Sequence, residues 1–197
     1  ESLSLLYREL ADYCEAKYSL LTQHTDPEKA LPPLLVRQQK AVDLITQCYQ
    51  QMHMLSAQNN TDYKRMLRIF QEALDLQEHI SVSLHQPEEV QKLVERSHAE
   101  EVIRWNAQTV AARLRVLADD ILYHRLPTRF TMEKQIGALE KIARQHPDNP
   151  VGQFCYWHFS RIARVLRTQK PLYARDLLAD KQRRMPLLPA LKSYLSL

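Results

Sequence analysis

A glutamate three residues before a histidine is the first spacing in this sequence that could do chemistry. Glu95 and His98 match one half of the di-iron carboxylate signature, which requires a second such pair and further inward-facing glutamates. No other histidine follows a glutamate at this spacing, and the His-Glu-x-x-His arrangement that binds zinc is absent. We interpret Glu95 and His98 as a surface pair, and we predict no metal-binding and no cofactor-binding residues.

The most aromatic stretch of the chain is residues 154–159, Phe-Cys-Tyr-Trp-His-Phe. Phe154, Trp157 and His158 could line a small-molecule pocket, because aromatic side chains are common in the walls of such pockets. The same side chains could instead anchor the core or a contact between subunits. Cys155 has only His158 nearby as an activating group, which disfavours a nucleophilic role. Phe154, Trp157 and His158 are therefore candidates for a pocket or a contact.

Three arginines, Arg161, Arg164 and Arg167, repeat at a spacing of three residues. Such a stripe could follow the phosphates of a nucleic acid. The spacing drifts slowly around a helix, and no reading-helix motif accompanies it. The pattern favours a solvated or acid-paired helix face, and we predict no nucleic-acid partner.

The adjacent carboxylates Asp119 and Asp120 do not form an acid/base pair, because neighbouring residues on a helix point about 100° apart. With no base, nucleophile or metal set to assemble, we predict no catalytic residues and no enzymatic activity.

The elements that would position these residues are helices. The chain has only 2 glycines in 197 residues, which disfavours tight hairpins and glycine-lined phosphate loops. Apolar residues recur at helical spacing almost throughout. We predict an all-α fold, an antiparallel helical bundle of about six helices joined by short loops.

Prolines and turn residues mark where the predicted helices begin and end. The first helix opens the chain and ends at residues 25–28, and the second starts after Pro33. The second runs to about Ala57 with one face of Leu35, Gln38, Val42, Ile45, Tyr49, Met52 and Leu55. The remaining predicted helices lie at residues 63–84, about 86–123, 132–143 and 154–165, with short helix or irregular chain after Pro171.

The 3 cysteines form no C-x-x-C pair and are odd in number, which fits a reducing compartment and no disulfide framework. No run of about 18 apolar residues occurs, so the sequence predicts no transmembrane helix within these residues.

The C-terminal end carries most of the positive charge. From Arg161 onward nine Lys and Arg residues oppose two acids, a net charge of about +7 where the whole chain has +4. A basic cluster before a leucine-rich tail is typical of the cytoplasmic face of a bilayer. We predict a bundle at residues 1–171 and a basic connector at residues 172–197, cut from a membrane protein. The predicted membrane-proximal residues are Lys181, Arg183, Arg184 and Lys192.

The two ends also resemble a known family. "ESLSLLYRELADYCEAKYSLL" and "YARDLLADKQRRMPLLPALKSYLSL" resemble segments that leave the first membrane half and enter the second in FUSC-like inner-membrane proteins of the YccS/YhfK type. The similarity spans the chain and is greatest to the YhfK type. The family is regarded as transporters, related to fusaric-acid resistance and aromatic-acid efflux proteins. It has no catalytic motif from which site residues could be transferred.

The resemblance implies a soluble cytoplasmic domain of an inner-membrane transporter or efflux protein, with a structural, assembly or regulatory role. Its partner would be the membrane, through flanking segments, with homo-oligomer formation left open and the transported small molecule unknown. A ligand-sensing domain near Phe154, Trp157 and His158 is one alternative. A nucleic-acid-binding module using the arginine stripe is a weaker one.

Overall fold

The computed structural model describes residues 1–22, 27–56, 61–82, 92–95 and 97–183, and these residues form an all-α bundle. Its helices are α1 (Ser2–Thr22), α2 (Pro27–Ser56), α3 (Thr61–Ser81), α5 (Ala99–Leu122), α6 (Glu133–Gln145) and α7 (Pro150–Arg183). A short helical segment at residues 92–95 precedes α5. The described residues contain no strand, and the predicted helical bundle is confirmed.

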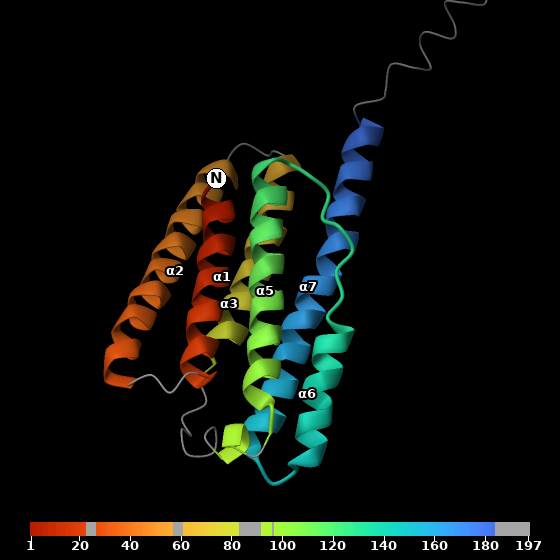
Figure 1. The fold of residues 1–197 in the computed structure, drawn as a ribbon. Helices are drawn as coiled ribbons and strands as arrows, with labels where there is room; N and C mark the ends of the chain where they lie inside the picture. Colours follow the sequence, from red (N-terminus) through yellow and green to blue (C-terminus); the bar gives the residue numbers. More distant parts are fainter. Residues whose placement is uncertain (23–26, 57–60, 83–91, 96, 184–197) are drawn as a thin grey trace, which may run out of the picture.

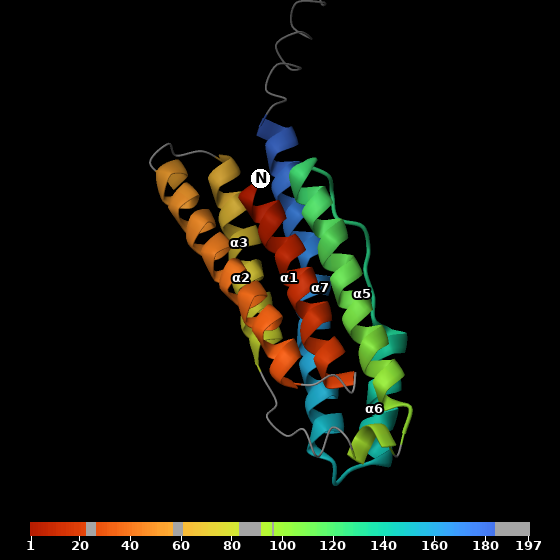
Figure 2. The same cartoon turned by 60° about the vertical axis from the view of Figure 1, so that its left-hand side comes forward.

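Successive helices run in opposite directions along one long axis (Figure 1). The start of α1 and the end of α7 consequently lie at the same end of the bundle, and a second view shows the same arrangement (Figure 2). The short α6 packs against the half of α7 nearer the opposite end. The bundle therefore has one end that holds both ends of the described chain.

Helix α1 is the centre of the bundle. It packs against α2, α3 and α5, whereas α7 packs against α3, α5 and α6. Apolar residues at helical spacing along α1, such as Leu3, Leu6 and Leu10, are buried. The rings of Tyr7 and Tyr18 are fully buried as well. Because neighbours surround α1, it also buries polar residues that a surface helix would leave in water.

Polar side chains cap the helices where the sequence breaks. The Asn149 side-chain oxygen accepts hydrogen bonds from the backbone N–H groups of Val151 (3.0 Å) and Gly152 (3.3 Å), and Pro150 takes the first helical position. An asparagine cap followed by proline is a strong helix start. The predicted break before the aromatic helix is confirmed.

The predicted helix from about residue 86 to Tyr123 is interrupted. Ser97 and His98 are not helical, and α5 begins at Ala99. The Ser97 hydroxyl donates to the Leu93 carbonyl (2.7 Å) and accepts from the Ala99 N–H (3.2 Å). The Ser97 side chain thus bonds both to the segment at 92–95 and to the first residue of α5, a local competition that apolar spacing does not reveal.

Two prolines were predicted to delay the second helix, which was wrong. Helix α2 begins at Pro27 and contains Pro32 and Pro33. Both lie near its N-terminal end, where losing two backbone hydrogen bonds costs less than ending a 30-residue helix.

The prediction of a short helix or irregular chain after Pro171 was also wrong, because α7 continues through Pro171 to Arg183 as one helix. Residues on both sides of Pro171 are mostly good helix formers, including Leu, Ala, Lys and Arg. The division into a bundle and a connector stays a prediction.

Candidate functional site

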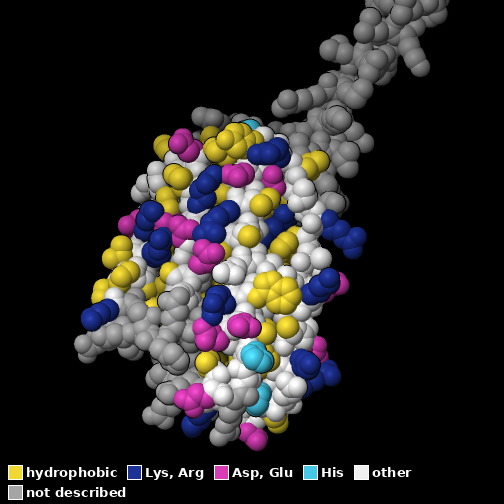
Figure 3. Space-filling view, viewed as in Figure 1, with side chains coloured by type: hydrophobic (Ala, Val, Ile, Leu, Met, Phe, Trp, Pro, Cys, Tyr) yellow, Lys and Arg dark blue, Asp and Glu magenta, His cyan; other side chains and the backbone are white. Residues whose placement is uncertain are grey.

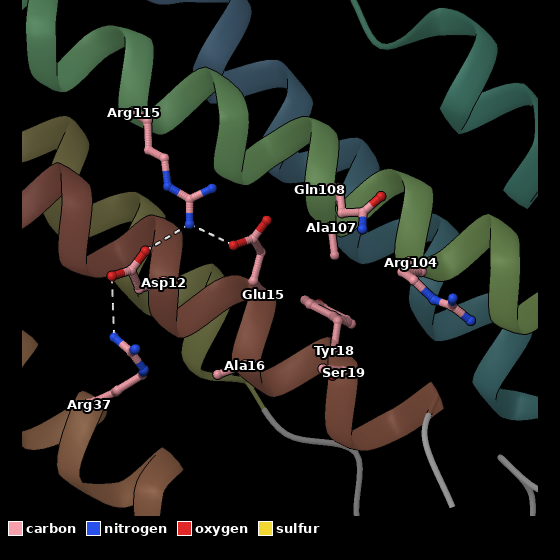
Figure 4. Close-up of a pocket in the computed structure, with 10 residues that line it drawn as sticks. All are labelled: Asp12, Glu15, Ala16, Tyr18, Ser19, Arg37, Arg104, Ala107, Gln108 and Arg115. Atoms are coloured by element: carbon pink, nitrogen blue, oxygen red, sulfur yellow. Dashed lines mark hydrogen bonds and ion pairs between the residues drawn. The ribbon is translucent and has the colours of Figure 1, made fainter.

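Three acids on one side of α1 form a cluster of ion pairs with arginine and lysine side chains of the neighbouring helices. Glu9, Asp12 and Glu15 follow one another at a spacing of three residues. Glu9 faces α2, whereas Asp12 and Glu15 lie where α5 also approaches α1 (Figure 4). The Glu9 side chain is only 3% exposed and pairs with Arg37 (3.2 Å) and Lys40 (2.5 Å) of α2. A buried carboxylate requires such partners, since an unpaired charge would be costly there.

The other two acids bind an arginine from the opposite neighbour. One terminal nitrogen of Arg115 on α5 lies 2.7 Å from Asp12 and 2.5 Å from Glu15 (Figure 4). Arg37 approaches Asp12 from α2, at 3.3 Å. The hydrogen bonds that Arg115 donates to the carboxylates of Glu15 and Asp12 raise the pKa of its guanidinium above its already high value. The acids of α1 thus connect α2 and α5 electrostatically.

These side chains line an open cleft of about 500 Å³ between α1 and its neighbours (Figure 4). Tyr18, Ser19, Gln108 and Arg104 complete its wall. Guanidinium and amide groups offer hydrogen-bond donors, and the two carboxylates of Asp12 and Glu15 offer acceptors. Such a surface suits a small polar ligand. Because the arginines are already paired with acids, a ligand anion would have to compete for them.

A second group of polar side chains lies within the core. Lys17 is 6% exposed and donates hydrogen bonds to the carbonyls of Ile80 and Val82 at the end of α3. Burial lowers its pKa to about 8. The sequence signal for this residue is a lysine within the apolar stripe of the first helix. A positive group there is favoured by the partial negative charge of a helix C-terminus.

The structure brings only two of the three predicted pocket residues together. Phe154 stacks on His158 with ring centroids 5.0 Å apart, and His158 is 6% exposed. Trp157 points away and is 62% exposed. None of these three lines the cleft in Figure 4; Tyr18 does, and its ring lies 6.1 Å from that of His158.

Burial favours the neutral forms of His158 and Cys155. It lowers the pKa of His158 to about 3, with Lys17, His79 and Arg161 adding smaller effects of the same sign. The Nε2 atom of His158 has no hydrogen-bond partner among the described residues. Burial also raises the pKa of the Cys155 thiol to about 12. A neutral histidine beside a protonated thiol gives no activated nucleophile.

The remaining sequence candidates stay apart. Arg164 and Arg167 border a hollow of about 240 Å³ between α6 and α7, beside Glu133. Asp119 pairs with Arg8, whereas Asp120 lies 4.0 Å from Arg125. Glu95 belongs to the helical segment at residues 92–95, whereas His98 is not helical, so the two do not share one continuous helix.

The predicted membrane-proximal cations lie outside the residues whose side chains are described. Lys181 and Arg183 belong to the last turns of the α7 backbone, and Arg184 and Lys192 follow it. Their predicted position stays a prediction.

Searches of the described residues found no group of three or more His, Cys, Asp or Glu that could hold a metal ion. Within the same residues, no helix has both the length and the apolar character needed to cross a bilayer. The described residues thus form an all-α bundle with a charged cleft.

Comparison with known protein families shows to which family the chain belongs. The family described as FUSC-like inner membrane protein yccS matches residues 1–177, and the chain belongs to that family. No solved structure matches the chain. Membership makes this a chain of an inner-membrane, transporter-like protein.

Proposed function

We propose that the bundle is the cytoplasmic domain of its inner-membrane protein, and that it supports, assembles or regulates the transport unit. One observation carries the proposal: the start of α1 and the end of α7 lie at the same end of the bundle (Figures 1 and 2). A domain held between two membrane segments needs both of its ends on the side that faces the bilayer. Lys181 and Arg183 belong to the last turns of α7, which reach this same end of the bundle (Figure 1).

In this proposal Lys181, Arg183, Arg184 and Lys192 lie near anionic lipid head groups. Each cation near such a surface contributes on the order of 1 kcal/mol of attraction. Membership of the inner-membrane family supports the membrane as partner. The rigid, centrally packed α1 would transmit movement or packing between the membrane parts and the rest of the bundle.

Vesicle co-sedimentation tests the membrane contact. The chain should bind anionic phosphatidylglycerol vesicles more strongly than neutral phosphatidylcholine vesicles. Replacing Lys181, Arg183 and Arg184 by Gln should abolish the difference. The matched control replaces Arg161, Arg164 and Arg167 by Gln, which removes the same charge from a part of α7 farther from its C-terminal end. Equal loss in both triple variants would refute a localised membrane contact.

The cytoplasmic side is tested in the whole membrane protein. Trp157, which is 62% exposed, is replaced by Cys and treated with a membrane-impermeant maleimide. Labelling only after the inner membrane is permeabilised supports the proposal. Labelling of intact spheroplasts would place the bundle on the opposite side.

The cleft favours a second candidate function, a ligand-sensing domain. Its support is the space of about 500 Å³ lined by Arg37, Arg104 and Arg115. Small organic anions, tested by thermal shift and calorimetry, should bind the chain and lose affinity in Arg104→Gln. Arg144→Gln is the control, because Arg144 forms the same kind of i,i+4 pair away from the cleft, with Glu140 at 2.5 Å. Equal affinity in both variants would exclude binding at the cleft.

A further inference from the structure

The outer face of α2 carries an apolar stripe that the bundle does not cover. Leu31, Leu35, Val42 and Tyr49 are 51%, 52%, 41% and 65% exposed. They are separated by four, seven and seven residues. This is the spacing of the a and d positions with which two helices pack in a coiled coil.

The stripe has no partner among the described helices. Among the helices that the structure describes, α2 packs only against α1 and α3, and it does so through an adjacent face that contains the buried Ala41, Cys48 and Met52. Apolar side chains are visible along the edge of the molecule over the lower half of α2 (Figure 3). A regular row of half-exposed apolar residues, unlike scattered ones, marks an interaction surface.

Among the side chains that the structure describes, the positions beside the stripe hold no Lys, Arg, Asp or Glu, and all but one are polar. They are Gln39, Thr46 and His53 on one side, with Gln38 and the half-buried Ile45 on the other. The nearest cations, Arg37 and Lys40, pair with Glu9 of α1. A stripe without charged neighbours can contact the same stripe of a second copy without like-charge repulsion. It has no charged groups with which to bind a highly charged partner selectively.

We propose that this stripe is the contact with a second copy of this chain, with the two α2 helices parallel and in register. The parallel arrangement rests on the proposed function, because two copies standing on one membrane share their orientation. A two-fold axis along the bundle then brings Leu35, Val42 and Tyr49 each against its own equivalent.

One helix stripe buries less than the roughly 800 Å² per partner of a standard stable interface. The contact is therefore weak between freely diffusing chains. Attachment of both copies to one membrane raises their effective concentration and completes the association. Disulfide cross-linking, which traps a weak dimer, is the suitable measurement.

Leu35→Cys and Tyr49→Cys are oxidised separately in the 197-residue chain, at increasing chain concentration. Each should form a disulfide-linked dimer at least about tenfold faster than Val36→Cys. Val36 is 68% exposed on the same helix, but it points about 100° away from Leu35. The native Cys14, Cys48 and Cys155 are buried, and the unsubstituted chain gives the background.

A charged side chain placed in the stripe should weaken the association of the two copies. Val42→Lys should weaken self-association in sedimentation equilibrium by about tenfold or more. Val116→Lys is the control, because Val116 on α5 is 45% exposed and Val42 is 41% exposed. Circular dichroism verifies that both variants remain folded.

The outcomes separate the surface from the membrane proposal. The contact is overturned if neither Leu35→Cys nor Tyr49→Cys cross-links faster than Val36→Cys, whether the two variants are oxidised alone or mixed. This holds even where vesicle binding succeeds. Cross-linking only in the mixture of the two variants shows antiparallel helices, which overturns the parallel contact. Parallel cross-linking without vesicle binding would support the contact and remove the membrane proposal instead.

Discussion

Helices α1 and α2 lie side by side, yet α1 buries charged side chains and α2 exposes apolar ones. The Glu9 and Lys17 side chains of α1 are almost inaccessible to water, whereas Leu35 and Tyr49 of α2 are more than half exposed. The difference follows from position, because among the described helices α1 packs against three others and α2 against two. It teaches that burial here depends on which helices surround a residue more than on the residue's own polarity.

The largest expected difference in stability is between a leucine variant in α1 and a leucine variant in α2. Leu10→Ala removes a fully buried side chain and should lower the free energy of unfolding by about 2–5 kcal/mol. Leu35→Ala, at 52% exposure, should change it by no more than about 0.5 kcal/mol. Urea unfolding of dilute chains measures both. A large loss in Leu35→Ala would mean that α2 packs more deeply than this structure indicates.

The buried lysine of α1 tests whether its polar contacts stabilise the fold. Lys17→Met removes the donor to the carbonyls of Ile80 and Val82. We expect a loss of about 1–3 kcal/mol, the cost of leaving a buried carbonyl without a donor. Lys40→Met is the control on α2, because Lys40 is 64% exposed and should lose less. An unchanged or higher stability in Lys17→Met would show that the buried charge costs more than its bonds contribute.

The histidine beside α1 predicts a dependence on pH. Burial lowers the pKa of His158 to about 3 in the folded chain, against about 6.5 in the unfolded chain. The unfolded chain therefore binds the extra proton, so stability is full above pH 6.5 and falls as pH drops from about 6.5 toward 3. The slope is at most about 1.4 kcal/mol per pH unit.

His158→Phe should flatten this dependence between pH 6.5 and 5. The control His53→Gln, at an exposed position of α2, should leave it in place. Thermal unfolding across that pH range measures the slopes. Identical slopes in the two variants would mean that another group takes up the proton.

The smallest effect concerns the ion pairs that join α1 to α2. Glu9→Gln removes the charge that pairs with Arg37 and Lys40, whose side chains are 40% and 64% exposed. Because both cations can return to water, we expect a loss of only about 1 kcal/mol. Glu100→Gln breaks a surface pair with Arg104 and should cost no more than about 0.5 kcal/mol. Denaturation at low and high salt distinguishes the two, since the buried carboxylate is screened less.

Local pattern was sufficient to predict the helices and several of their boundaries. Asn149 followed by Pro150 marks the start of α7 because capping uses neighbouring residues only. Boundaries failed where two local preferences competed. Pro171 disfavours a helix that its neighbours favour, and Ser97 interrupts apolar spacing that continues past it.

The candidate site was less predictable, because its members are distant in sequence. Arg115 meets Asp12 and Glu15 across about a hundred residues, and no spacing within either helix indicates the pairing. The aromatic stretch at residues 154–159 was recognised, but its division into a partly buried Phe154 stacked on a buried His158 and an exposed Trp157 depends on which face α3 and α5 cover.

The sequence by itself determined an all-α chain, because glycine scarcity, apolar spacing and proline position act over a few residues. It also carried the similarity by which the chain belongs to the FUSC-like inner-membrane family. Only the tertiary structure decided that α1 is central and α2 peripheral. Packing is a property of the whole bundle, so the same amphipathic pattern is buried in one helix and left as a free surface in the other.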